Sequence, residues 1–169
     1  MLLAGTFLRV VDEKLRLPIP KPFRDAIGIS DGLVMYMVPG TDGSLALYPE
    51  SSFARLADQL AVSPPTGQEV RAFSRLFFAQ AQRVELDGQG RVRLATELMK
   101  FASITKEVVL LGVRDHVEVW DKANWDLYLA QNQPHFDQLA EQAFAQGLRQ
   151  QPSAGTSPVS PSERPSQPR

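Results

Sequence analysis

A short pattern that occurs twice constrains the fold of this chain more than any other feature of its sequence. The pattern is an aspartate, three further residues and an arginine, with apolar residues on both sides. It is found at Asp12–Arg16 and again, 75 positions later, at Asp87–Arg91. Matching apolar stretches follow both copies, so the sequence predicts two equivalent units. Two equivalent tips with an arginine each indicate a binding module better than they indicate a single catalytic pocket.

The repeat extends well beyond the two tips. A second pair of apolar strands ends at residues 45–49 in the first half and at residues 117–121 in the second, an offset of 72. A helical pattern follows each of these ends. Its matching apolar positions are Phe53 and Leu56 in the first half, and Trp125 and Tyr128 in the second. The shorter offset predicts a longer loop in the first half, at residues 38–44.

Composition narrows the class of protein. A unit of roughly 50 residues buries too little surface to be stable alone, so two fused units are expected to cover each other's apolar faces. The chain has no cysteine, which excludes disulfides and thiolate sites. It has no apolar run long enough to span a membrane and no signal segment at Met1, so we expect a cytoplasmic protein without membrane contact.

Alternation and turn residues predict the elements of the first half. Residues 3–11 and 15–20 are predicted to pair as a hairpin, and residues 33–38 and 45–48 to form a second one. A short helix is expected at 21–27 with Gly28 as its C-terminal stop. A longer helix is expected from Pro49, and a break at residues 63–67.

The second half is predicted in the same way. The expected elements are a joining helix at 69–80, a short helix at 96–102, a hairpin of 108–112 with 117–120, and two C-terminal helices separated by Pro134. Asp121 is a good N-cap for the first of these helices. Residues 151–169 are rich in Pro and Ser and are expected to be disordered. The predicted division is a first unit at 1–62, a linker and joining helix at 63–82, a second unit at 83–133, a C-terminal helix at 134–150 and the tail at 151–169.

The tips carry the chemistry. An aspartate at the start of a turn accepts backbone N–H bonds, so Asp12 and Asp87 are predicted to be structural. Each arginine can clamp that aspartate or contact a ligand, and the residues alone leave both roles open. Gly88 and Gly90 suit a turn with positive φ. The first tip has Leu15 where the second has Gly90, which predicts a strained turn or an exposed apolar contact.

These motifs together resemble the MraZ family, bacterial transcriptional regulators made of two fused AbrB-like units. The resemblance rests on the paired Asp-x-x-x-Arg motifs and covers roughly residues 1–145. It is supported by Leu17–Pro20, Thr105–Val108, and the Leu-Tyr-Pro and Val-Trp-Asp ends of the halves. The implied fold class is α+β, with two pseudo-symmetric swapped-hairpin β units, short helices, a joining helix and C-terminal helices. Leu15 departs from the family, which has glycine before its first arginine.

The resemblance implies binding of double-stranded DNA at short direct repeats in the promoter of the cell-division and cell-wall gene cluster. It also implies a homo-oligomeric ring, a nucleoid-associated location and no cofactor. Residues 1–24 hold five cations against two carboxylates, which agrees with a basic binding face. The residues predicted to contact DNA are Arg9, Lys14, Arg16, Arg91 and Arg93.

Other functions have less support in the sequence. The only histidines, His116 and His135, have no metal-ligand spacing, and no nucleophile motif, phosphate loop or carboxylate pair is recognisable, so we expect neither a metal nor an enzyme. Trp120, Trp125 and Phe136 fit a core or a subunit contact better than a base-stacking platform. The main alternative is a ring-forming interaction protein whose tips bind a protein partner and not DNA.

Overall fold

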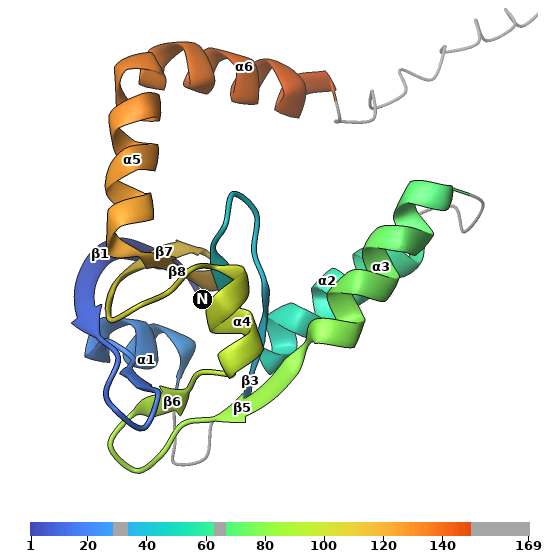
Figure 1. The fold of residues 1–169 in the computed structure, drawn as a ribbon. Helices are drawn as coiled ribbons and strands as arrows, with labels where there is room; N and C mark the ends of the chain where they lie inside the picture. Colours follow the sequence, from blue (N-terminus) through green and yellow to red (C-terminus); the bar gives the residue numbers. More distant parts are fainter. Residues whose placement is uncertain (29–33, 63–66, 150–169) are drawn as a thin grey trace, which may run out of the picture. The chain divides into compact units, whose positions relative to one another are not determined.

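The computed structural model describes residues 1–28, 34–62 and 67–149 of the chain. These residues divide into a compact unit that ends at Ala130 and a second unit that begins at Gln131. Eight strands lie in the first unit (Figure 1). They are β1 (Leu3–Val10), β2 (Arg16–Pro18), β3 (Val34–Pro39), β4 (Leu45–Pro49), β5 (Gln82–Glu85), β6 (Arg91–Arg93), β7 (Glu107–Arg114) and β8 (His116–Asp121).

The helices fall between these strands and after them. They are α1 (Lys21–Ile27), α2 (Glu50–Val62), α3 (Gln68–Gln80), α4 (Thr96–Phe101), α5 (Lys122–Asn132), the 3₁₀ turn η1 (Gln133–His135) and α6 (Phe136–Arg149). The predicted joining helix, both short helices and the interruption at Pro134 are confirmed. The predicted tail lies outside the described residues, and so does most of the predicted break at 63–67.

Six strands form one antiparallel sheet in the order β1-β7-β8-β4-β3-β5. The order is a palindrome of the two halves, because β7, β8 and β5 of the second half match β3, β4 and β1 of the first. At its centre Ala46 lies opposite Glu118, the residue 72 positions later. Each half gives its outermost strand to the other half. The structure is therefore α+β with swapped strands, as predicted.

One predicted pairing is wrong. Residues 3–11 and 15–20 do not form a hairpin with each other, because β1 pairs with β7 and β2 pairs with β6. The two short strands β2 and β6 form a separate antiparallel ribbon, in which Leu17 lies opposite Val92. Two exchanges of strands thus join the halves.

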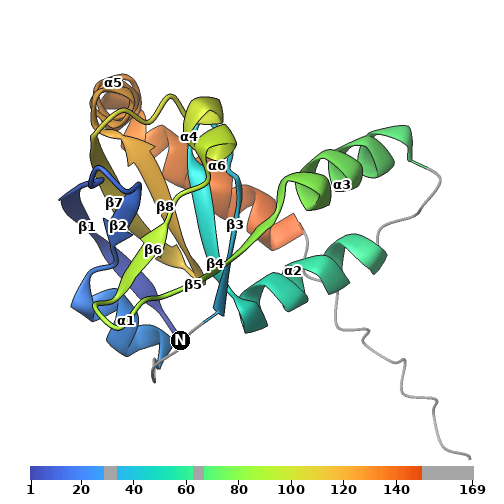
Figure 2. The same cartoon turned by 60° about the horizontal axis from the view of Figure 1, so that its bottom comes forward.

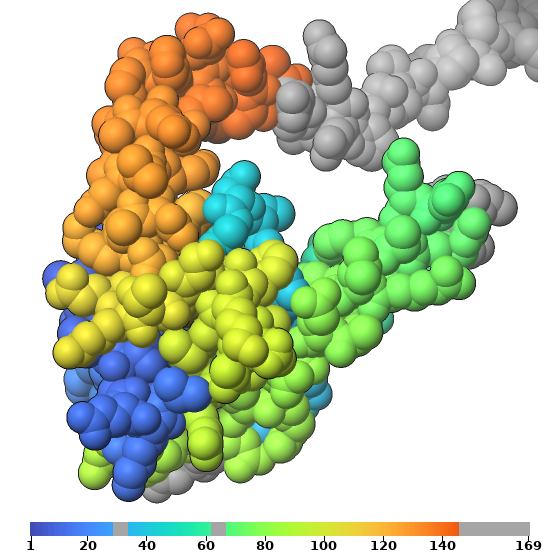
Figure 3. Space-filling view, in the orientation of Figure 1, coloured from blue at the N-terminus to red at the C-terminus, as the bar shows by residue number. Residues whose placement is uncertain are grey.

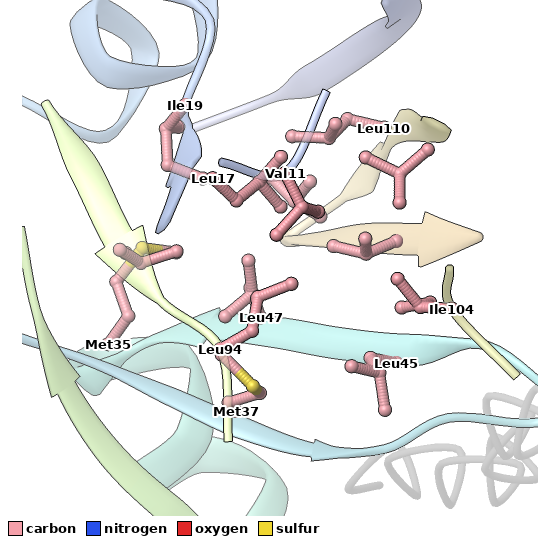
Figure 4. Packing of buried hydrophobic residues seen from close by; sticks show 14 of the residues in the cluster. Val11, Leu17, Ile19, Met35, Met37, Leu45, Leu47, Leu94, Ile104 and Leu110 are labelled. Atoms are coloured by element: carbon pink, nitrogen blue, oxygen red, sulfur yellow. The ribbon is translucent and has the colours of Figure 1, made fainter. Parts of the chain in front are cut away.

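The main core lies between the large sheet, the ribbon and the short helices (Figure 4). Leu17 and Val92 enter it from the ribbon, and Leu47 and Leu110 from the sheet; all four are fully buried. Phe23 of α1 is buried as well and meets Phe7 edge-to-face at 5.0 Å between ring centroids. Burial of side chains of this size stabilises a fold by about 1.5–3 kcal/mol each.

The opposite face of the sheet carries two smaller apolar clusters. Phe53 and Leu56 of α2 pack with Val38, Ala46 and Phe77. The equivalent cluster in the second half contains Trp125 and Tyr128 of α5 together with Val109, Leu111 and Trp120. The predicted match between these two helices is confirmed. Figure 2 shows α2 and α5 beside the two halves of the sheet, as the repeat requires.

The helix ends follow from single residues. Gly28 ends α1 in the left-handed conformation with φ +81°, as predicted, and its N–H donates to the carbonyl oxygens of Arg24 and Asp25. The carboxylate of Asp121 accepts the N–H of Ala123 at 3.0 Å, which confirms the predicted cap of α5. Its other oxygen accepts the N–H and the hydroxyl of Thr105. Asp121 therefore also fixes the loop that precedes β7.

Residues 131–149 of the second unit carry a strongly amphipathic helix. Phe136, Leu139 and Phe144 of α6 are all exposed. An apolar stripe on one face of a helix usually packs against another apolar surface, so α6 is a candidate for a contact with a partner.

Candidate nucleic-acid interface

The first tip is built around the carboxylate of Asp12. Its Oδ1 accepts the backbone N–H groups of Lys14 and Arg16, both at 2.9 Å. Its Oδ2 accepts Nε of the Arg16 side chain at 2.7 Å. The N–H of Leu15 donates to the carbonyl oxygen of Asp12 and closes the turn. One side chain thus fixes the whole tip.

The second tip repeats this network. Oδ1 of Asp87 accepts the backbone N–H groups of Gln89 at 2.9 Å and of Arg91 at 3.0 Å. Oδ2 accepts both Nε and Nη2 of Arg91, at 2.8 and 2.7 Å. The aspartates are therefore structural, as predicted, and the arginines take part in the clamp. A guanidinium has five N–H donors, so the clamp leaves three free in Arg91 and four in Arg16.

These bonds favour the charged form of each aspartate. The side-chain bond from Arg91 and the backbone bonds from Arg91 and Gln89 outweigh desolvation and lower the pKa of Asp87 to about 2. The pKa of Asp12 is lowered too, chiefly by the backbone N–H of Arg16. Stability that comes from a lowered carboxyl pKa is present above the unfolded pKa and is lost as the pH falls through the folded pKa.

Asp87→Asn tests this network, because asparagine keeps an acceptor but loses the charge that holds Arg91. We expect a lower urea midpoint than that of the original chain, with a difference that is constant above about pH 4 and disappears toward pH 2. The control is Asp25→Asn, at an exposed position in α1 where the carboxylate is paired with Lys21. A difference that does not depend on pH would contradict the assignment.

The turn residues show one correction. Gly90 has φ +73°, as predicted for this position. Gly88 does not have a positive φ, so that part of the prediction is wrong; the first tip has Glu13 at this place, and no special backbone conformation is needed there. Leu15 has φ +58°, a conformation strained for a leucine. It is half-buried against the main core and does not form an exposed apolar contact.

The ribbon of β2 and β6 brings three arginines onto one face. Arg16 lies opposite Arg93, and Pro18 lies opposite Arg91. Side chains alternate along a strand, so these four residues face away from buried Leu17 and Val92. The side chains of Arg16 and Arg91 are 32% and 22% exposed, and Arg93 is exposed. In Figure 3 the blue N-terminal residues, which include the first tip, lie next to the yellow and yellow-green residues of the second half.

Two other predicted contacts lie elsewhere. Lys14 is exposed on the first tip. Arg9 belongs to β1 and not to the ribbon. Its Nη1 donates to the carbonyl oxygen of Leu8 at 2.7 Å, and its guanidinium lies 5.5 Å from the centroid of the Phe7 ring. The structure therefore brings Arg16, Arg91 and Arg93 together, with Lys14 at the edge, and leaves Arg9 on the large sheet.

One residue at the site had no predicted role. The guanidinium of Arg24 in α1 packs directly on Gly90, where an added Cβ would come within 2.5 Å of Nη1. The chain after β2 runs beside the second tip, since the N–H of Ile19 donates to the carbonyl oxygen of Gly90 at 2.9 Å. The sequence indicates this contact through two differences between the halves. Leu15 stands at the position equivalent to Gly90, and Met99 stands at the position equivalent to Arg24.

His116 lies in a separate polar cluster on the sheet. Its ring stacks on Tyr48 at 4.5 Å, and Nδ1 lies 3.0 Å from Asp115 and Nε2 lies 3.7 Å from Glu118. Burial lowers the pKa of His116, but the two carboxylates raise it further, and the net shift is upward. Burial and the same two carboxylates raise the pKa of Tyr48 to about 12. His116 is thus a hairpin residue with two anionic neighbours.

His116→Gln is expected to lower stability at acidic pH. A raised histidine pKa stabilises the fold fully below the unfolded pKa of about 6.5, and the effect is lost as the pH rises through the higher folded pKa. The urea midpoints of variant and original chain should therefore differ at pH 5 and converge at alkaline pH. His135→Gln, an exposed position in the second unit, serves as the control. Midpoints that converge at low pH instead would refute this assignment.

A surface hollow lies where α5 begins. It is lined by Val10, Thr105, Lys106, Glu107, Asp121, Lys122, Ala123 and Asp126. Its aspartates are engaged locally, Asp121 with Thr105 and Ala123, and Asp126 with Lys122. Within the described ranges, no group of three or more His, Cys, Asp or Glu side chains is placed to hold a metal ion. None of the described helices is long and apolar enough to cross a membrane.

The geometry defines a class of protein. Two halves exchange strands around a pseudo-twofold axis, and each presents an aspartate-braced tip with an arginine, so this is a tandem swapped-hairpin protein. The sequence matches the family described as "MraZ protein, putative antitoxin-like" twice, over residues 2–76 and 77–147. The chain belongs to the MraZ family.

Similar proteins cover most of the chain. A protein of Desulforamulus reducens named transcriptional regulator MraZ is 39% identical over 137 residues, which is 81% of this chain and 94% of that protein. Proteins of the same name from Finegoldia magna and Saccharopolyspora erythraea are 37% and 34% identical, over 78% and 83% of this chain and 89% and 95% of their own lengths.

Proposed function

We propose that this chain is a transcriptional regulator that binds specific sites in double-stranded DNA through the β2–β6 ribbon and the two tips. The observation that carries the proposal is the row of Arg16, Arg93 and Arg91 on one outward face of a two-stranded ribbon. The names of the relatives support the regulatory role. We do not expect a reaction to be catalysed, and the function requires no cofactor.

The shape of the ribbon suits the major groove of DNA. A groove about 12 Å wide admits a two-stranded ribbon, whose strands lie about 5 Å apart. The free N–H donors of Arg16 and Arg91 can bind a phosphate, or the O6 and N7 atoms of guanine, in a bidentate way. Arg93 and Lys14 add cations beside them. The carboxylates Asp12 and Asp87 orient the arginines before DNA is bound, which lowers the entropy lost on binding.

Several copies of the chain would strengthen this binding. One tip makes few contacts, and each is salt-sensitive. An oligomer that places tips along spaced repeats gains by effective concentration. We propose a closed ring in which the exposed stripe of Phe136, Leu139 and Phe144 contacts a neighbouring subunit. Light scattering that shows a monomer at micromolar concentration would contradict the ring.

The family resemblance supplies the proposed target. The sites are short direct repeats in the promoter of the cell-division and cell-wall gene cluster, and the protein acts in the cytoplasm on the nucleoid. The alternative, tips that bind a protein partner, has less support because Leu15, the apolar residue of the first tip, is half-buried against the main core.

Fluorescence anisotropy with two duplexes tests the proposal. One duplex carries the region upstream of the chain's own gene, and the other has the same bases in scrambled order. We expect at least about 10³-fold tighter binding to the upstream duplex, with an affinity that falls as salt rises. A footprint on the upstream region then gives the spacing of the sites. Equal affinity for both duplexes would overturn sequence-specific binding.

A further inference from the structure

Arg24 is held in an unusual environment at the second tip. An added Cβ on Gly90 would lie 2.5 Å from Nη1, 2.7 Å from Cζ and 2.9 Å from Cδ of Arg24. The missing side chain of a glycine therefore makes the room for this guanidinium. Nε of Arg24 is buried and has no hydrogen-bond partner. A buried donor without an acceptor is costly, so the position demands another explanation than stability alone.

The charge of Arg24 is also uncompensated within the part of the chain that the structure describes. The neighbouring cations are paired with carboxylates, Arg91 with Asp87 and Lys21 with Asp25. Among the described residues, no carboxylate lies within ion-pair distance of Arg24, and its side chain is half-buried. The second tip therefore carries one neutral ion pair and one free cation, and the free cation comes from the first half of the chain.

The first tip is built differently at the same positions. Leu15 stands in place of Gly90, and Met99 of α4 stands in place of Arg24. Met99 lies in the main apolar core, and Leu15 packs against it. The free cation of the first tip is instead Lys14, whose place in the second tip is taken by Gln89. Besides Arg93 on the ribbon, each tip thus has a cation beside its clamp, Lys14 at the first and Arg24 at the second.

We propose that Arg24 and Arg91 form a site for one phosphate of the DNA backbone at the second tip. The inference rests on the proposed function and adds to it a residue and a ligand group. The phosphate supplies the negative charge that Arg24 lacks, and the free donors of Arg91 contact the same anion. Packing on Gly90 holds the guanidinium in place. A phosphate contact positions the protein on DNA and carries no base sequence.

The test is Arg24→Met, which installs the residue that the first tip uses. Loss of one phosphate contact lowers the slope of log K against log salt by about 0.9 for each bound tip. We expect this lower slope, about tenfold weaker binding at 100 mM salt, and an unchanged preference for the upstream duplex over the scrambled one. The matched control is Arg75→Met on exposed α3, which removes the same charge elsewhere and should leave the slope unchanged.

If Arg24→Met and the original chain have the same salt slope, the proposed phosphate site is wrong. The proposed function still stands in that case, provided that the original chain binds the upstream duplex. Failure of the original chain to bind any duplex overturns both. The phosphate site is also wrong if Arg24→Met loses its preference for the upstream duplex together with its affinity. Arg24 would then support the base contacts of the ribbon and not bind a phosphate.

A second measurement uses the original sequence and does not depend on the folding of Arg24→Met. The Nε–Hε signal of Arg24, assigned by its loss in Arg24→Lys, should shift when the upstream duplex is added and stay in place with inorganic phosphate at millimolar concentration. A signal that the duplex does not move overturns the site. If the Arg24 signal shifts with inorganic phosphate and not with the duplex, the site does not bind the DNA backbone.

Discussion

Arg16→Ala is expected to weaken binding to the upstream duplex by about 10- to 100-fold, and Arg91→Ala by a similar factor, since one bidentate arginine contact with DNA contributes about 1–3 kcal/mol. Each substitution removes a cation and also releases the carboxylate of Asp12 or Asp87, which then repels the phosphates. The tip should stay folded, because Oδ1 of Asp12 still accepts the backbone N–H groups of Lys14 and Arg16. Anisotropy titration measures the effect.

The control for this prediction is Arg83→Ala. Arg83 is exposed on β5, is paired with Glu85 and carries the same charge, but it is not on the ribbon. Its replacement should change the affinity by less than about twofold. A folded Arg16→Ala chain with unchanged affinity would remove Arg16 from the interface. A chain that instead melts or loses its oligomer would show that the clamp is its main role.

Leu17→Ala is expected to lower the free energy of unfolding by about 2–5 kcal/mol, the usual range for truncating a fully buried leucine. Leu17 lies opposite Val92 on the pseudo-twofold axis of the ribbon, so its removal leaves a cavity beneath the arginine face. DNA affinity should fall as well, although Leu17 itself faces away from solvent. Urea denaturation gives the first quantity and anisotropy the second.

Leu8→Ala is the matched control, because Leu8 of β1 is 51% exposed. It should change the free energy of unfolding by no more than about 0.5 kcal/mol. Similar losses for Leu17→Ala and Leu8→Ala would mean that the ribbon is not anchored in the core as the structure shows.

The repeat made most of the fold predictable. Two copies at a fixed offset place Phe53 and Trp125 in equivalent helices, and the structure packs them in equivalent clusters. Local rules also predicted the stop at Gly28 and the cap at Asp121, because each depends on one residue and its immediate neighbours.

Strand partners were not predictable in this way. Alternation of apolar and polar residues shows that a segment is a strand, but it carries no information on which strand lies beside it. The nearest partner for residues 3–11 was the next strand, whereas β1 pairs with β7, about a hundred residues away. Arg24 was missed for a related reason, since its contact with Gly90 exists only after the halves exchange strands.

The first copy of the repeat shows why Gly88 needs no special backbone conformation. Glu13 occupies the same position in the first tip, and a turn that accepts glutamate there needs no positive φ. Comparison of the two copies, position by position, is thus more informative than the residue type in either copy.

Unlike tips on one chain give the molecule a direction. In a homodimer of single units the two tips are made by the same residues. A ligand that contacts both tips equally must then have the same twofold symmetry, as a palindromic DNA site has. Here the tips are covalently joined and differ, with Leu15 and Met99 on one side and Gly90 and Arg24 on the other. A ligand that spans both tips therefore contacts two different surfaces at its two ends. Its orientation is then fixed by the chain, and on direct repeats of the kind proposed above we expect successive copies to point the same way.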